Sequence, residues 1–173
     1  MRNIAILCAV ATLSACSSQP GGRLVWLDKP QDKRALAGES KTIADLRAAN
    51  YQAMVARNLD RTMSIVGEDY VIVAGNSSIR RSSADMRGRW TGAFADPTWK
   101  ACVRKPDKIE VGQNAGVLRA AERGQWQCPR TTSADETIAY GSYLAHWKKS
   151  AGIWTFVSDN YVPLGCSGKE CVR

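Results

Sequence analysis

The sequence is poor in the groups that most catalytic and metal sites require. It has one histidine, His146, and its six cysteines include no pair with the Cys-x-x-Cys spacing typical of zinc sites. We also find no phosphate-binding glycine loop, no nucleophile triad and no internal repeat. The sequence therefore predicts neither a metal centre nor a bound cofactor.

One continuous apolar run occurs at the start of the chain. Arg2 precedes an apolar segment from Ile4 to Leu13, and small residues follow that end in Cys16. This run is too short to span a bilayer. It resembles a bacterial lipoprotein signal. This resemblance implies that residues 1–15 are removed and that Cys16 is acylated, with palmitate among the attached acyl groups. Ser17 after the cysteine resembles the default sorting to the outer membrane, facing the periplasm. The alternative is an ordinary secretory signal in which the cysteine is incidental.

The remaining cysteines suit an oxidising compartment. Two of the six leave with the signal or carry lipid, Cys8 and Cys16, so an even number remains for two disulfides. Cys102 and Cys128 lie at nearly equal distances on either side of a turn-rich segment, residues 112–116. This places them opposite each other across a hairpin. Cys166 and Cys171 lie on either side of a short, flexible loop. The predicted bridges are Cys102–Cys128 and Cys166–Cys171.

Charge is unbalanced but not concentrated. Lys and Arg number 24 against 16 Asp and Glu, a formal net charge of +8. The basic residues are scattered and form no dense run. We therefore predict no nucleic-acid partner and interpret the excess as solvated surface charge, which outside the cytoplasm faces anionic headgroups and envelope polymers.

The first part of the mature chain has helical periodicity, interrupted by one β-branched run. Thr42 with Asp45 resembles a capping box ahead of an amphipathic helix, and Ser82 or Ser83 precedes another helix that stops at a proline. The predicted elements are helices at 42–57, 60–66 and 82–96 and a strand at 70–74.

From residue 99 onward the pattern is extended. Helices followed by a long meander indicate an α+β domain in which a curved antiparallel sheet wraps around the N-terminal helices. The predicted strands are 99–111, 116–127, 136–149 and 152–163. The predicted organisation is a signal peptide at 1–15, a tether at 16–40, a domain at 41–165 and a disulfide-closed tail at 166–173.

The order of six short segments carries a family resemblance. They are Tyr51–Asp60, Gly67–Val73, Phe94–Pro97, Arg104–Val111, Ala120–Trp126 and Gly141–Trp154. In this order they resemble the nuclear transport factor 2-like superfamily and, within it, the SnoaL-like proteins. The resemblance implies a cone-shaped, cystatin-like fold that encloses an apolar pocket, with an open sheet face through which members form homodimers.

The resemblance also implies positions for a pocket. We expect most tryptophans in the core, and Trp90 and Trp126 as pocket walls together with Tyr51. Ketosteroid isomerases of this fold use a helix tyrosine and a carboxylate base at the end of the strand after the helices. Those positions correspond to Asn50 or Tyr51 and to residues 73–75, where this chain has Val-Ala-Gly. The isomerase base is therefore missing.

His146 is the weak candidate for a catalytic acid or base. If its side of the strand faces inward, it lies in the pocket and can serve there as an acid or base near neutral pH. By alternation, Tyr140, Leu144 and Lys148 share its side, while Tyr143, Ala145 and Trp147 occupy the other.

Two pairs of polar residues also draw attention. Asp159 and Tyr161 share one side of a strand and are expected to form a polar patch. Arg104 and Glu122 lie on opposing arms of the predicted hairpin, but their register does not make them direct partners.

Two functions fit these observations. The first is a lipid-anchored, noncatalytic domain that binds an apolar small molecule or a partner protein. The alternative is a SnoaL-like or ketosteroid-isomerase-like pocket enzyme, an isomerase, dehydratase or hydrolase, in which His146 or a carboxylate acts as the base. The missing carboxylate favours the first.

Overall fold

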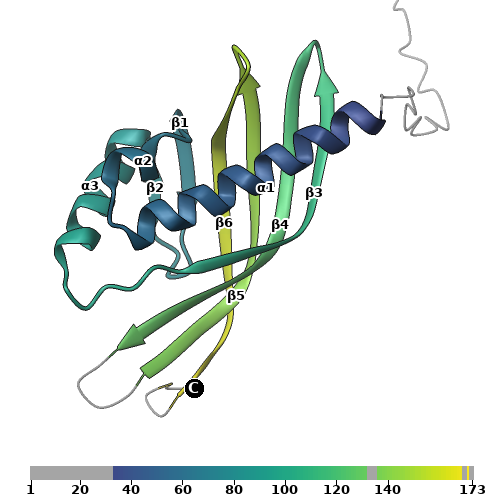
Figure 1. Cartoon of the computed structure of the whole chain (residues 1–173). Coiled ribbons are helices and arrows are strands. Elements are labelled where there is room, and N and C mark those ends of the chain that lie inside the picture. The colour runs from purple at the N-terminus through teal and green to yellow at the C-terminus, as the bar shows by residue number, and fades with distance from the viewer. Residues whose placement is uncertain (1–32, 132–135, 169–170, 172–173) are drawn as a thin grey trace, which may run out of the picture.

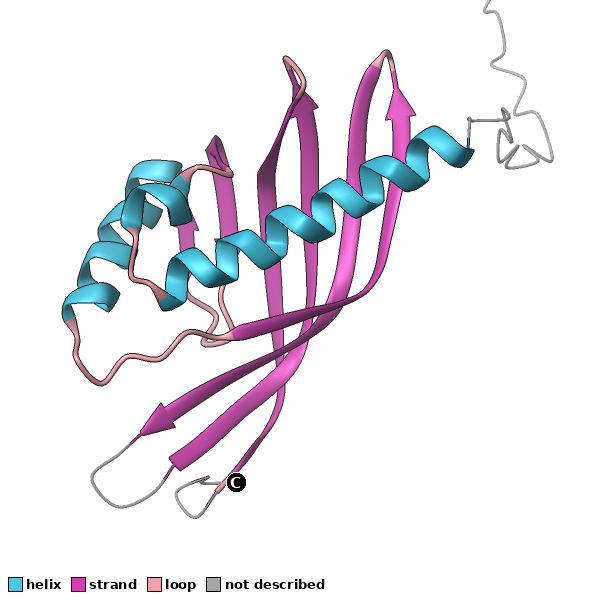
Figure 2. Ribbon diagram, viewed as in Figure 1, coloured by secondary structure: helices cyan, strands magenta, loops and turns pink. Residues whose placement is uncertain are grey.

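Three helices lie on the concave side of a curved six-stranded sheet (Figure 1, Figure 2). The computed structural model describes residues 33–131, 136–168 and Cys171. The predicted signal peptide and Cys16 lie outside these residues. The helices are α1 (Lys33–Val55), α2 (Leu59–Met63) and α3 (Ser83–Ala95). The strands are β1 (Val66–Val73), β2 (Ile79–Arg81), β3 (Val103–Asn114), β4 (Val117–Thr131), β5 (Glu136–Ser150) and β6 (Ile153–Ser167).

The curved sheet is antiparallel as predicted at every pair but one, which makes it mixed. Its strand order is β2-β1-β6-β5-β4-β3, in which β1 and β6 are parallel and all other neighbours antiparallel. The chain passes from β2 through α3 to the opposite edge of the sheet, and the four-strand meander returns from there. Because each strand of the meander reverses the direction of the one before it, β6 as the fourth strand runs parallel to β1.

Helix α1 begins earlier than predicted. Residues 33–40, assigned to the tether, are helical. Thr42, predicted to cap the helix, lies inside it, and its hydroxyl donates to the carbonyl of Gly38 at 3.1 Å. Because a threonine inside a helix can bond the carbonyl one turn back, the capping-box pattern was misleading here.

The caps of the other two helices are short polar side chains. Asn58, rather than Asp60, caps α2, and its side-chain oxygen accepts from the backbone N–H of Arg61 at 3.0 Å. Ser82 caps α3 as predicted and accepts from the backbone N–H of Asp85 at 3.3 Å. Each cap satisfies a backbone donor that the first turn leaves unpaired.

The two long hairpins have tight turns where the sequence predicted them. Ala115 and Gly116 join β3 to β4, and Ala151 and Gly152 join β5 to β6; all four have positive φ. Two consecutive positive φ values match the right-handed twist of the flanking strands. The hairpins thus extend the sheet well beyond the helices (Figure 2).

Both predicted disulfides are present. Cys102, just before β3, is bonded to Cys128 on β4, with the two Cα atoms 4.2 Å apart. Cys166 near the end of β6 is bonded to Cys171, with Cα atoms 5.7 Å apart. Disulfides persist in oxidising compartments, which favours an extracellular or periplasmic setting. No helix among the described residues is long and apolar enough to cross a membrane.

Candidate functional site

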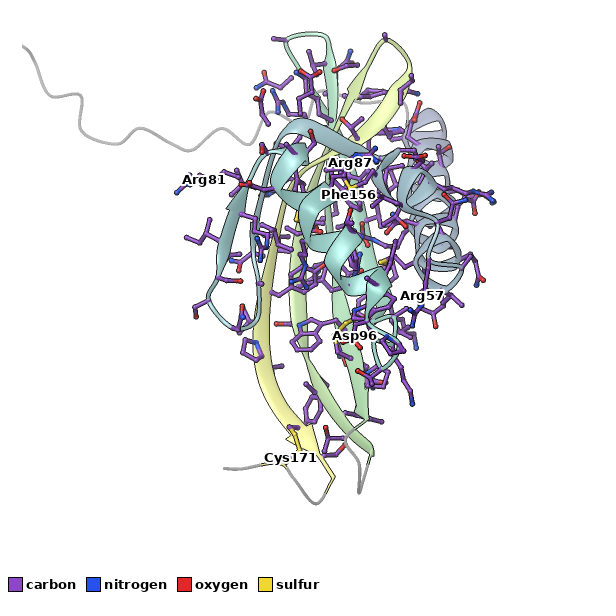
Figure 3. All side chains as sticks on the ribbon, turned by 90° about the vertical axis from the view of Figure 1, so that its left-hand side faces the viewer. Arg57, Arg81, Arg87, Asp96, Phe156 and Cys171 are labelled. Atoms are coloured by element: carbon purple, nitrogen blue, oxygen red, sulfur yellow. A yellow bond between two sulfur atoms is a disulfide. The ribbon has the colours of Figure 1, made fainter. Side chains whose placement is uncertain are left out.

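A cavity of about 590 Å³, here called the outer cavity, lies between α3, the turn after β1, and β4 to β6. Three tryptophans line it beside polar and charged side chains: Trp90 from α3, Trp99 from the segment before β3, and Trp126 from β4. Asp96, the C-cap residue of α3 that Figure 3 labels, also lines it. This volume is in the range of small-molecule sites.

The aromatic wall is held by contacts within and around α3. The ring centroid of Trp90 lies 5.8 Å from that of Trp99, and Phe94 lies 5.2 Å from Trp99. Arg57, after α1, donates to the carbonyls of Phe94 at 2.8 Å and Trp99 at 3.2 Å. The arginine thereby ties the segment that carries Trp99 to the end of α1.

A second cavity of about 30 Å³, here called the inner chamber, lies deeper in the cone. Trp90, Arg104 and Tyr161 line both cavities, so the two adjoin. The inner chamber is also lined by Tyr70 and Asp159. Its volume suits a group of about one or two water-sized atoms.

One carboxylate oxygen of Asp159 accepts two hydrogen bonds, and the other accepts none within the described residues. Its Oδ2 accepts from the hydroxyls of Tyr70 at 2.9 Å and Tyr161 at 3.2 Å. Its Oδ1 lies 3.8 Å from Nη2 of Arg47 and has no hydrogen-bond partner within the described part of the chain. The residue is 4% exposed, so the free oxygen is shielded from bulk water.

Both tyrosines beside Asp159 stay protonated. Burial, followed by the negative charge of Asp159, raises the pKa of Tyr70 well above its ordinary value. Burial likewise raises the pKa of Tyr161, although the positive charge of Arg104 opposes this. Neutral phenols donate hydrogen bonds, which keeps Oδ2 occupied and leaves Oδ1 as the oxygen without a hydrogen bond.

The second buried carboxylate, Glu122, has both of its oxygens occupied. It accepts from Nε and Nη2 of Arg47 at 2.8 and 2.9 Å, from the Tyr143 hydroxyl at 2.6 Å and from the Trp147 indole at 2.8 Å. Although burial opposes the charged form of Arg47, the negative charges of Asp159 and Glu122 raise its pKa. Glu122 thus holds the fold together rather than facing a ligand.

Two of the four predicted pocket residues, Trp90 and Trp126, line the outer cavity. Trp90 and Trp126 form its walls, and the Trp126 indole donates to the carbonyl of Ser142 at 3.0 Å. Tyr51 packs, half-buried, against the core and lines neither cavity. Its neighbour Asn50 lines the inner chamber and donates to the carbonyl of Thr62 at 2.8 Å.

His146 lies outside both cavities, so its predicted place in the pocket is wrong. The alternation along β5 is as expected, but Tyr143, Ala145 and Trp147 occupy the buried side. His146 is exposed on the other side, where Nδ1 lies 2.9 Å from the Ser158 hydroxyl.

Sequence reasoning missed the part played by Arg47 and anticipated that of Asp159 only in part. Arg47 is an isolated charge in a helix whose partners lie 75 and more residues away, and no local pattern reveals them. The predicted polar patch of Asp159 and Tyr161 is real and buried. Arg104 and Glu122 do not pair, since Glu122 lies opposite Ile109 in the hairpin. Within the described residues no three His, Cys, Asp or Glu side chains gather in a way that could hold a metal.

Comparison with known proteins identifies the fold. No family model and no curated protein matches the sequence. Among solved structures, a nuclear transport factor 2-like protein of unknown function from Shewanella oneidensis has a TM-score of 0.59 at 16% identity and covers 73% of this chain and 98% of its own. A candidate scytalone dehydratase from Novosphingobium aromaticivorans has a TM-score of 0.64 at 12% identity, covering 82% and 93%. A hexachlorocyclohexane dehydrochlorinase from Novosphingobium barchaimii has a TM-score of 0.56 at 15% identity, covering 83% and 99%.

These similarities define an α+β protein with the nuclear transport factor 2-like fold, in agreement with the resemblance seen in the sequence. Proteins with this fold include enzymes as well as proteins of unknown function. At such low identity the likeness concerns the fold alone, so activity must be argued from the site.

Proposed function

We propose that this protein is an exported binding domain that holds an apolar small molecule in the outer cavity. The main support for this proposal is a concave site of about 590 Å³ that is lined by Trp90, Trp99 and Trp126. Large aromatic walls stabilise an apolar ligand by area burial and ring contacts. The disulfide between Cys102 and Cys128, both of which line the cavity, stiffens one wall. A cavity of this size favours a small molecule over a partner protein as the ligand.

The neutral dye N-phenyl-1-naphthylamine tests this proposal. Saturable binding with enhanced fluorescence is expected for the wild-type domain. Ala74→Trp, which fills part of the outer cavity, should abolish it, whereas Ile153→Trp, at a surface site that is 63% exposed, should not. Near-ultraviolet circular dichroism checks that both variants fold. Absence of saturable binding to the wild type, or equal binding by both variants, would contradict the proposal.

A second candidate function rests on Asp159. Asp159 lines the inner chamber, which adjoins the outer cavity, and its Oδ1 accepts no hydrogen bond within the described residues, so this oxygen is the candidate to accept a proton from a carbon of a bound molecule. Transfer of that proton to Oδ1 would leave a carbanion that eliminates or is reprotonated elsewhere, as in a dehydratase or isomerase. The site would then be that of a pocket enzyme.

Hydrogen exchange distinguishes the two functions. Molecules that copurify with the domain are identified by mass spectrometry and incubated in deuterium oxide with the wild type and with Asp159→Asn. Deuterium uptake that requires Asp159 supports the enzyme. Uptake with neither protein, together with dye binding, supports the binding domain.

We further propose that the domain is anchored to the outer membrane, facing the periplasm, by lipid on Cys16. The lipoprotein-like start of the chain and the two disulfides support this location. Cys16→Ala should release the protein into the soluble periplasmic fraction. Unchanged membrane fractionation of this variant, or processing that is insensitive to globomycin, would contradict lipidation.

A further inference from the structure

Two arginines line the outer cavity and a third lies near one of them, without a carboxylate partner among the described residues. Arg104 lines both cavities, and its Nη2 donates to the sulfur of Met54 at 3.4 Å. Arg89 lines the outer cavity with its guanidinium 5.6 Å from the ring centroid of Trp90. Arg80 lies close enough to affect Arg89 electrostatically, and its buried Nε has no hydrogen-bond partner in the described part of the chain.

The arginines repel one another. Partial burial, followed by the positive charges of Arg80 and Arg104, lowers the pKa of Arg89. Guanidinium groups set beside like charges destabilise a site unless an anion neutralises them. The cavity thus holds positive charge that the described residues leave unbalanced.

The carboxylates that line the two cavities have other partners. Asp96 accepts from the backbone N–H of Thr98 at 2.8 Å and from its hydroxyl at 2.7 Å. Asp159 lies at the inner end, where Tyr70 and Tyr161 donate to it. No hydrogen bond or ion pair joins either of them to Arg89 or to Arg104 within the described residues, so these guanidinium groups remain open to a ligand.

We propose that the ligand is an amphipathic organic anion, whose charged group binds Arg89 and Arg104 while its apolar body lies against Trp90 and Trp126. Planar guanidinium groups bind carboxylate, sulfonate and phosphate oxygens in pairs, which gives orientation as well as attraction. This inference rests on the proposed function of the outer cavity, and it adds the charge class of the ligand.

Two dyes with the same aromatic body test the charge preference. The probes are 8-anilino-1-naphthalenesulfonate, which is anionic, and the neutral N-phenyl-1-naphthylamine. The wild type should bind the anionic dye at least tenfold more tightly. Added salt should weaken the anionic dye selectively, since it screens the guanidinium charges.

Substitutions test whether Arg89 and Arg104 cause the preference for the anionic dye. The double variant Arg89→Gln, Arg104→Gln should lose the preference and keep its affinity for the neutral dye. Arg81→Gln is the control, because Arg81 is exposed and points away from the body of the protein (Figure 3). If the double variant fails to fold by near-ultraviolet circular dichroism, the single variant Arg89→Gln is used, and a loss of several-fold for the anionic dye alone is expected.

The outcomes separate this inference from the proposed function. Binding of the neutral dye without preference for the anion overturns the inference and leaves the apolar site intact. A loss that is equal for both dyes in the arginine variants also overturns it, because the arginines would then act through packing. Failure of both dyes to bind the wild type overturns the proposed function itself.

Discussion

Arg47 of α1 and Glu122 of β4 form a bidentate pair inside the cone, with Nε 2.8 Å from Oε1 and Nη2 2.9 Å from Oε2. The two residues are 2% and 0% exposed. The guanidinium also lies 4.3 Å from the ring centroid of Phe156, which sits in the middle of the molecule (Figure 3). Because buried charges are costly unless fully paired, this contact fixes α1 in one position across the sheet.

Removal of the negative charge should destabilise the domain strongly. Glu122→Gln keeps the size of the side chain but leaves the Arg47 charge buried without its main partner, and breaking such a pair typically costs about 3–5 kcal/mol. Urea unfolding measures the change. The matched control is Glu110→Gln, since the pair of Glu110 with Lys108 is exposed and salt-screened and should contribute little. An unchanged urea midpoint for Glu122→Gln would show that the pair does not hold the helix.

The buried tyrosines predict a response to alkaline pH. Burial, then negative charge on Asp159 or Glu122, raises the pKa values of Tyr70 and Tyr143 in the folded state. A raised folded pKa stabilises the protein below the unfolded value of about 10, and this stabilisation is lost as pH rises further. Phenolate absorbance at about pH 11 should therefore be lower in the native protein than in urea. Identical titration curves in both states would contradict the buried network.

The two disulfides should contribute unequally to stability. They have sequence separations of 26 and 5 residues. In the chain-entropy treatment their loss costs about 3.5 and about 2 kcal/mol, respectively. Paired Cys→Ser variants, compared by urea unfolding, measure the difference. A larger effect from the C-terminal pair would show that the entropy of loop closure does not decide which disulfide contributes more.

Much of the fold follows from local patterns. The hairpin with a disulfide across its arms could be predicted because the turn lies midway between Cys102 and Cys128, and the strand periodicity placed the meander. The parallel pairing of β1 with β6 could not be predicted in this way, since it depends on how the whole chain crosses the sheet. The short edge strand β2 was missed because its three residues are too few to show the alternation of apolar and polar residues that indicates a strand.

The site was less predictable than the fold. Trp90 and Trp126 were placed correctly, since the fold resemblance fixes which elements meet at the cavity. Alternation sorted the residues of β5 into two sides but could not say which side is buried. Trp147, 1% exposed, faces inward and so places its neighbour His146 outside. The Arg47 pairing joins α1 to β4 and β6, and local sequence carries no signal for it.

The exposed position of His146 predicts that it is dispensable. Its imidazole contacts the Ser158 hydroxyl on the outer sheet face, and it lines neither cavity. His146→Gln keeps hydrogen-bonding capacity but does not titrate near neutral pH. The affinity for N-phenyl-1-naphthylamine should therefore stay within about twofold of the wild type, because this dye contacts none of the groups that the change alters. Cellular complementation should likewise persist, whereas the cavity-filling Ala74→Trp should fail in both assays. Complete loss of function in a stably folded His146→Gln protein would instead place chemistry on the outer face of the sheet.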